Sequence, residues 1–169
     1  MAKKTIQRFL PNPNKIRHHK SLKIFGHLLQ DANLWHLNRR SARGAFAVGL
    51  FFAFIPVPFQ MILAAAGAII FRVNLPISVA LVWLTNPITM PPIFYGSYLV
   101  GTLILNQPEQ HFVFEASWSW FLESIETIGP AFLLGSLVCA SIASIISYIT
   151  IDIVWRRSVI KARAARTKK

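Results

Sequence analysis

Residues 85–92, "TNPITMPP", place three prolines and an asparagine in the middle of a strongly apolar run that extends from Leu75 to Leu105. That run is long enough to cross a bilayer, because about 20 apolar residues cover its hydrocarbon core. A proline inside a helix removes an amide donor and displaces a carbonyl of the preceding turn. We therefore predict two shorter helices joined by a break.

A second uncharged apolar segment, residues 44–71, comes earlier in the chain and is divided by Pro56 and Pro58. In hydrocarbon, every backbone group left without a partner costs several kcal/mol. The two breaks are therefore predicted to pack against each other or to line a wet cavity. The residues predicted to break these segments are Pro56, Pro58, Pro87, Pro91 and Pro92.

A third apolar segment, residues 131–155, follows Gly129-Pro130 and contains no further proline. The whole chain is 54% hydrophobic and 14% charged, against about 45–50% and about 25% in soluble domains. The predicted fold class is an all-α integral membrane protein. It has proline-broken transmembrane or re-entrant helices, one continuous C-terminal transmembrane helix, and an N-terminal interfacial amphipathic helix.

The basic residues flank the apolar part of the chain. Of the 18 Lys and Arg residues, ten lie between Lys3 and Arg43 and seven between Arg156 and Lys169, while four of the six acidic residues lie in 106–128. By the positive-inside rule, this predicts a multi-pass protein of the inner membrane with both termini cytoplasmic. Nucleic acid is disfavoured as a partner, because basic residues beside membrane helices ordinarily set topology and attract anionic lipids.

The predicted organisation has three parts: a basic cytoplasmic tail with the amphipathic helix (1–40), a membrane domain (41–155) with an outer amphipathic stretch at 106–128, and a second basic cytoplasmic tail (156–169). Because 131–155 crosses once, the two broken segments together must cross an odd number of times. One of them is therefore predicted to be re-entrant. The position of Arg72 favours 44–71 as the re-entrant segment and 75–105 as the span, although the reverse assignment also satisfies the parity.

Polar residues accompany both breaks and their flanks. Free amides and carbonyls at broken helix ends bind ions and substrates in transporters with discontinuous helices. The alternative is structural: Thr85 and Asn86 cap the half-helices, and Gln60 pairs with a freed carbonyl. The sequence leaves both interpretations open. The predicted substrate-binding residues are Gln60, Thr85, Asn86, Thr89, Arg72 and Asn74.

The sequence does not favour an enzyme. The apolar segments contain no pair of carboxylates, the five histidines lack metal-ligand spacing, and no His or Lys base accompanies the Ser and Thr residues. No catalytic residue, cofactor or metal site is predicted. Asp152 is predicted to pair with Arg156, four residues later on the same helix.

Small residues recur at four-residue spacing in two of the apolar segments, which lets helix backbones approach closely in lipid. This pattern predicts close packing of helices. The predicted partners are membrane lipids and either further copies of the chain or another membrane protein. The three series are Ala45, Gly49, Ala53, then Gly135, Cys139, Ala143, Ser147, and finally Ser136, Ala140, Ser144.

Two long motifs resemble the bacterial membrane family called domain of unknown function 2062: "ARGAFAVGLFFAFIPVPFQMILAAAGAIIFRVNLP" and "TNPITMPPIFYGSYLVG". The resemblance covers about residues 40–155. It rests on the glycine-rich entry, the P-x-P-x-Q turn, the R-x-N-L-P link and the N-P-[ILM]-T-x-P-P turn. It implies a membrane fold, and because some members are similar to proteins joined to glycosyltransferase domains, it hints at envelope glycan or lipid metabolism. The family has no established activity.

Two functions are consistent with these features. The first is a small carrier, or a protein that handles a lipid or envelope precursor, with its site at the two breaks. The second is a non-transporting membrane adaptor or scaffold, which recruits partners or anionic lipids through its basic tails.

Overall fold

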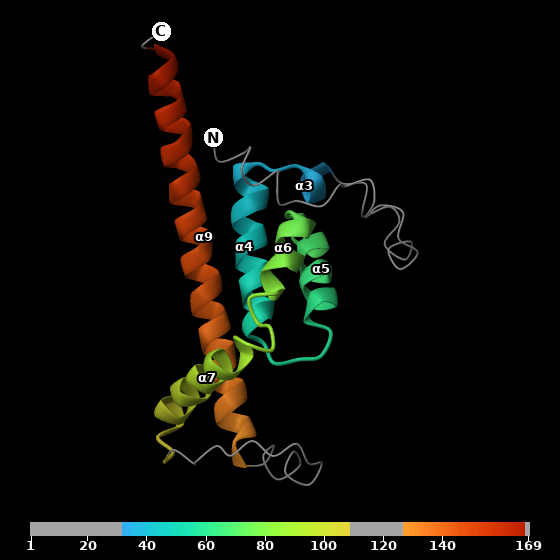
Figure 1. Cartoon of the computed structure of the whole chain (residues 1–169), viewed down its shortest axis with the longest axis vertical. Coiled ribbons are helices and arrows are strands. Elements are labelled where there is room, and N and C mark those ends of the chain that lie inside the picture. The colour runs from blue at the N-terminus through green and yellow to red at the C-terminus, as the bar shows by residue number, and fades with distance from the viewer. Residues whose placement is uncertain (1–31, 109–126, 168–169) are drawn as a thin grey trace.

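The computed structural model describes residues 32–108 and 127–167, and all secondary structure within these ranges is helical (Figure 1). The predicted N-terminal amphipathic helix and the outer amphipathic stretch fall largely outside the described residues. The helices are α3 (Ala32–Trp35), α4 (Arg39–Phe54), α5 (Gln60–Ile70), α6 (Leu75–Val82), α7 (Met90–Leu105) and α9 (Gly129–Thr167). The predicted all-α class is confirmed.

Helices α4, α5 and α6 pack together on one side of the long helix α9, and α7 crosses α9 below them (Figure 1). Helix α4 packs against α9, α5 and α6, α5 also packs against α6, and α7 packs against α9. Helices α4 and α5 run in opposite directions, so segment 44–71 is a helical hairpin whose two ends lie at the same end of the molecule. Helices α6 and α7 then lead to the opposite end, from which α9 returns along the whole length (Figure 1).

The first break forms where the sequence predicts it. Helix α4 ends at Phe54, and Ile55 is extended, with φ −81° and ψ 120°, as expected for a residue that precedes a proline. After Pro58 the chain reverses through Phe59, whose φ of 62° is left-handed. Helix α5 then begins at Gln60.

The second break begins and ends earlier in the sequence than predicted. It lies between Val82 and Met90 and contains Pro87. Pro91 and Pro92, by contrast, lie in the first turn of α7. The first amide groups of a helix have no intrahelical acceptor, so prolines there remove no hydrogen bond. These two prolines therefore begin a helix rather than interrupt one.

A small core joins α3, α4, α5 and α6. Its buried residues include Leu34, Ala45, Ala68 and Val73. The predicted small residues of α4 are buried, and a Cβ placed on Gly49 would lie 2.7 Å from the backbone oxygen of Ser78 in α6. The small residues thus let α4 and α6 pack almost backbone to backbone.

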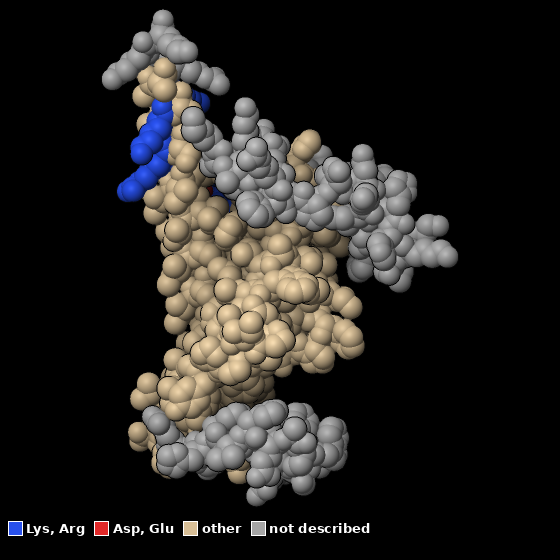
Figure 2. Space-filling model, viewed as in Figure 1, with Lys and Arg blue, Asp and Glu red and all other residues tan. Residues whose placement is uncertain are grey.

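Helix α9 contains 39 residues, which gives it a length of about 58 Å. It continues well beyond residue 155, through the basic residues shown near the top of Figure 2. Within the described part of the chain it is the one helix long and apolar enough to cross a membrane. Many of its large apolar side chains are exposed, which supports association with a membrane: Leu133, Leu137, Ile142, Ile145, Ile146, Ile149 and Ile153.

Candidate functional site

Gln60 joins the two breaks. Its side-chain Nε2 donates a hydrogen bond to the backbone oxygen of Ile55 at 2.6 Å, and its Oε1 accepts one from the hydroxyl of Thr85 at 3.3 Å. The Thr85 hydroxyl also lies 3.1 Å from the backbone oxygen of Val82. One side chain of α5 therefore pairs with the carbonyl freed at the first break and with a polar group of the second.

A cavity of about 490 Å³ lies where the breaks meet. Its wall is formed by the first break, the start of α5, the end of α6, the second break and the start of α7. Phe59 and Trp83 line it and are exposed, so the cavity opens to the surroundings. Its size falls within the range of small-molecule sites, about 300–1,000 Å³.

The lining of the cavity is mostly apolar and carries no charged side chain. Aromatic and aliphatic groups such as Phe94 and Met90 make up most of the wall. The polar side chains are those of Gln60, Thr85 and Asn86. The site thus offers an apolar surface with a few hydrogen-bonding groups, which is the usual composition of a pocket for a neutral ligand.

Asn86 and Thr89 cap the second break. The Asn86 Oδ1 accepts hydrogen bonds from the backbone amides of Ile88 at 2.9 Å and Thr89 at 3.1 Å. The Thr89 hydroxyl accepts one from the backbone amide of Asn86 at 3.1 Å and donates to the backbone oxygen of Leu84. These contacts match the structural alternative for Asn86, while its side chain still lines the cavity.

Arg72 and Asn74 do not line the cavity. They lie in the connection between α5 and α6, at the far end of α5 from Gln60. That helix contains eleven residues, which gives it a length of about 16 Å. Asn74 is fully buried, and its Oδ1 accepts a hydrogen bond from the backbone amide of Ile77 at 3.1 Å, so it caps α6. The six predicted site residues are therefore divided between two places.

A cluster of arginines around Asp152 was only partly predicted. The expected contact with Arg156 is present, at 3.1 Å. In addition, Arg39 makes two contacts with the Asp152 carboxylate, at 2.6 and 2.9 Å, and Arg43 makes one at 2.8 Å. Asp152 is the only acidic residue within 32–108 and 127–167. A lone carboxylate near the end of an apolar helix was the signal in the sequence, but nothing local indicated which distant arginines would reach it.

No group of three metal-binding side chains occurs within the described ranges. The chemistry available at the breaks is hydrogen bonding and apolar contact, supplied by the Gln60 amide, the Thr85 hydroxyl and the surrounding wall.

Comparison with known proteins identifies a family but no function. Neither the curated proteins nor the solved structures include a significant match to the chain. The family described as "Uncharacterized protein conserved in bacteria (DUF2062)" matches residues 22–164. That match covers most of the 169 residues and includes both breaks, the cavity and the arginine cluster. The chain therefore belongs to this uncharacterised bacterial family, domain of unknown function 2062.

Proposed function

We propose that this protein is a multi-pass protein of the bacterial inner membrane that handles a lipid or a lipid-linked envelope precursor, with its site in the cavity between the two breaks. The observation that carries this proposal is the meeting of the breaks: Gln60 and Thr85 are hydrogen bonded beside an open cavity of about 490 Å³. Broken helices inside a membrane are stable only where protein or water pairs with their freed backbone groups.

The proposed topology follows from the path of the chain. Segment 44–71 enters and leaves at one face as a re-entrant hairpin, α6 and α7 together cross to the other face, and α9 crosses back. Both termini are then cytoplasmic, in agreement with the basic residues at either end of the sequence. The breaks lie beside α9, nearer the start of that helix than its C-terminal end (Figure 1), and we propose that the cavity between them lies within the bilayer.

The lining of the cavity determines which part of a ligand it binds. A phosphate moved there would lose its hydration and meet no positive side chain, which is strongly unfavourable in an apolar environment. A neutral group with an apolar chain would instead pack against Trp83 and Phe94 and bond to Gln60. The cavity therefore takes an acyl or isoprenoid chain, or another uncharged part of a lipid.

Photo-crosslinking tests this site. A benzoylphenylalanine residue in place of Trp83, which lines the cavity and is exposed, is expected to form a discrete lipid adduct in growing bacteria. The control is the same residue in place of Ile145, which is also exposed but lies on α9 outside the cavity lining. Mass spectrometry of the purified protein identifies both sets of adducts.

The two positions should give different results. A bound ligand enriches one lipid class at position 83, whereas position 145 contacts the bulk phospholipid mixture. The same mixture at both positions would contradict the carrier proposal. It would favour the adaptor function instead, for which the specific observation is the exposed basic end of α9 beyond Arg156 (Figure 2).

Cysteine labelling tests the topology. In a Cys139→Ser background, Arg72→Cys is expected to react with a membrane-impermeant maleimide only in inverted vesicles. Gln107→Cys, at the opposite end of the chain path, should react in intact spheroplasts; both positions are exposed. Labelling of both positions from one face would exclude α6 and α7 as a membrane span.

A further inference from the structure

We propose that Arg39, Arg43 and Arg156, held together by Asp152, bind the phosphate of an anionic phospholipid. This site is separate from the cavity and does not depend on the function proposed above. We call these four residues the arginine cluster. It joins the start of α4 to the second half of α9.

The arginine cluster has more positive charge than its own carboxylate neutralises. Three guanidinium groups face one carboxylate, and no other acidic residue occurs in the described part of the chain. The contacts with Asp152 engage only one or two of the several N–H donors on each arginine. The Nε atom of Arg43 is buried and has no hydrogen-bond partner among the described residues. This unpaired donor adds to the positive potential of the cluster, and the partly exposed side chains of all three arginines leave donors that a phosphate can reach.

The guanidinium groups are held in place before any ligand arrives. Arg39 is fixed by its two contacts with Asp152. Arg43 is held from two sides, because it contacts Asp152 and lies over the ring of Tyr148, with 4.7 Å from its guanidinium carbon to the ring centroid. A fixed planar guanidinium matches the paired oxygens of a phosphate, and little side-chain entropy is lost on binding.

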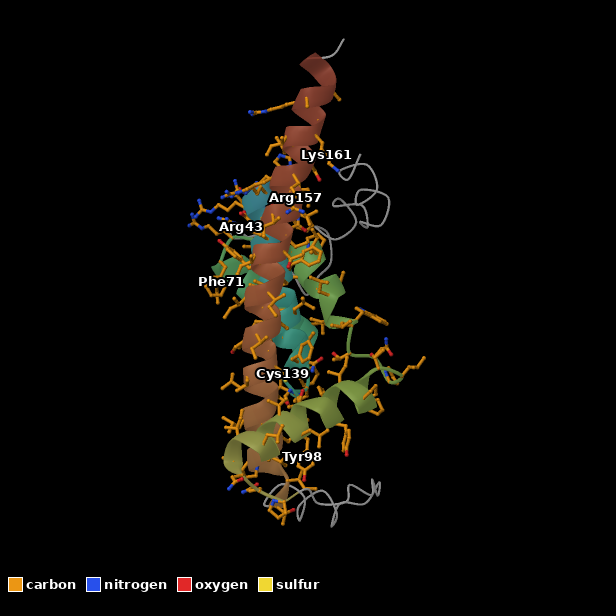
Figure 3. All side chains as sticks on the ribbon, turned by 90° about the vertical axis from the view of Figure 1, so that its left-hand side faces the viewer. Arg43, Phe71, Tyr98, Cys139, Arg157 and Lys161 are labelled. Atoms are coloured by element: carbon orange, nitrogen blue, oxygen red, sulfur yellow. The ribbon has the colours of Figure 1, made fainter. Side chains whose placement is uncertain are left out.

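The surroundings favour a lipid as the source of the phosphate. Arg43 lies at the same end of the molecule as Arg157 and Lys161 (Figure 3), which gives the whole end a positive field. On α9, Ile149 lies three residues before Asp152 and Ile153 one residue after it, and both are exposed. A phospholipid can place its phosphate on the arginines and its acyl chains along these isoleucines, whereas a free phosphate uses only the first of these surfaces.

Arg156 provides the sharpest test. It is exposed and pairs with Asp152 within α9, so Arg156→Gln leaves the contacts between α4 and α9 intact. The matched control is Arg157→Gln, which removes the same charge from the next, also exposed, residue. The full chain in detergent is titrated with dihexanoyl phosphatidylglycerol, dihexanoyl phosphatidylcholine or inorganic phosphate, and binding is measured by calorimetry.

The proposal predicts a specific order of affinities among the lipids and among the variants. Phosphatidylglycerol should bind more tightly than phosphatidylcholine, and Arg156→Gln should weaken its binding about tenfold, the effect of one lost charge-assisted hydrogen bond. Arg157→Gln should weaken it less than about twofold, as expected for a solvated charge. Arg43→Gln, which removes the guanidinium held by Asp152 and Tyr148, should weaken it at least as much as Arg156→Gln.

Two outcomes would overturn the proposal. An equal loss of affinity for phosphatidylglycerol in Arg156→Gln and Arg157→Gln would mean that the lipid binds only through the general positive charge at this end of the molecule. Inorganic phosphate that binds as tightly as phosphatidylglycerol, and competes with it, would make the ligand a free anion rather than a lipid. The thermal unfolding curve of each variant in detergent alone confirms that the fold is retained.

Discussion

Replacement of Gly135 by alanine is expected to separate α7 from α9 and to destabilise the protein strongly. A Cβ at Gly135 would overlap the backbone oxygen of Ser97, and a Cβ at Gly101 would overlap the backbone oxygen of Ala131. Both clashes are with backbone, which cannot move aside as a side chain can. We therefore expect Gly135→Ala and Gly101→Ala each to cost roughly 3 kcal/mol, the upper part of the usual range for overpacking.

Gly96 supplies the matched control on α7. A Cβ at that position has no neighbour within 4 Å, and alanine is favoured over glycine inside a helix by about 1 kcal/mol. Gly96→Ala should therefore unfold at the same or a higher temperature than the unmodified protein in detergent. Equal melting temperatures for Gly135→Ala and Gly96→Ala would show that α7 does not cross α9 through this glycine contact.

Replacement of Asp152 by asparagine is expected to loosen α4 from α9. The substitution removes the charge that holds Arg39, Arg43 and Arg156 together, so these three cations are left to repel one another. The melting temperature of the purified protein should fall clearly. It should fall further at low ionic strength, where repulsion between exposed charges is least screened.

A double-variant cycle separates this contact from a general loss of stability. Arg39→Gln alone should also lower the melting temperature, because it removes the two-point contact with Asp152. Once Asp152→Asn is present, Arg39→Gln should lower it little further, or even raise it by relieving repulsion. Strictly additive effects of the two substitutions would show that Arg39 and Asp152 do not act together.

Local features of the chain were predictable because they depend on near neighbours. Pro56 and Pro58 end α4 through their effect on the backbone, and Asp152 pairs with Arg156 four residues along α9. Small residues at four-residue spacing marked the buried face of α4, and in the first series of α9 two of the four, Gly135 and Ser147, are buried. In each case the cause and its effect lie within one helical turn of each other, so the local sequence holds the needed information.

Pro91 and Pro92 show a limit of prediction from local sequence, because they were predicted to break a helix and instead lie in the first turn of α7. A proline pair looks the same in sequence whether it interrupts a helix or begins one. The difference depends on where the preceding turn closes, and here Asn86 and Thr89 close it just before Met90. Arg72 and Asn74 show the same limit. They follow the first broken segment in the sequence, but the structure places them at the end of α5 that is far from the breaks.

The sequence alone established an all-helical, strongly apolar chain with two proline breaks, polar residues near them and basic ends, since composition and helix termination are short-range properties. Only the tertiary structure showed that Gln60 bonds to Thr85 beside a cavity and that Arg39 and Arg43 reach Asp152. These partners lie 25, 113 and 109 residues apart in the chain. Their meeting depends on how the hairpin, α7 and α9 pack, and that packing is set by contacts between segments rather than by any one of them.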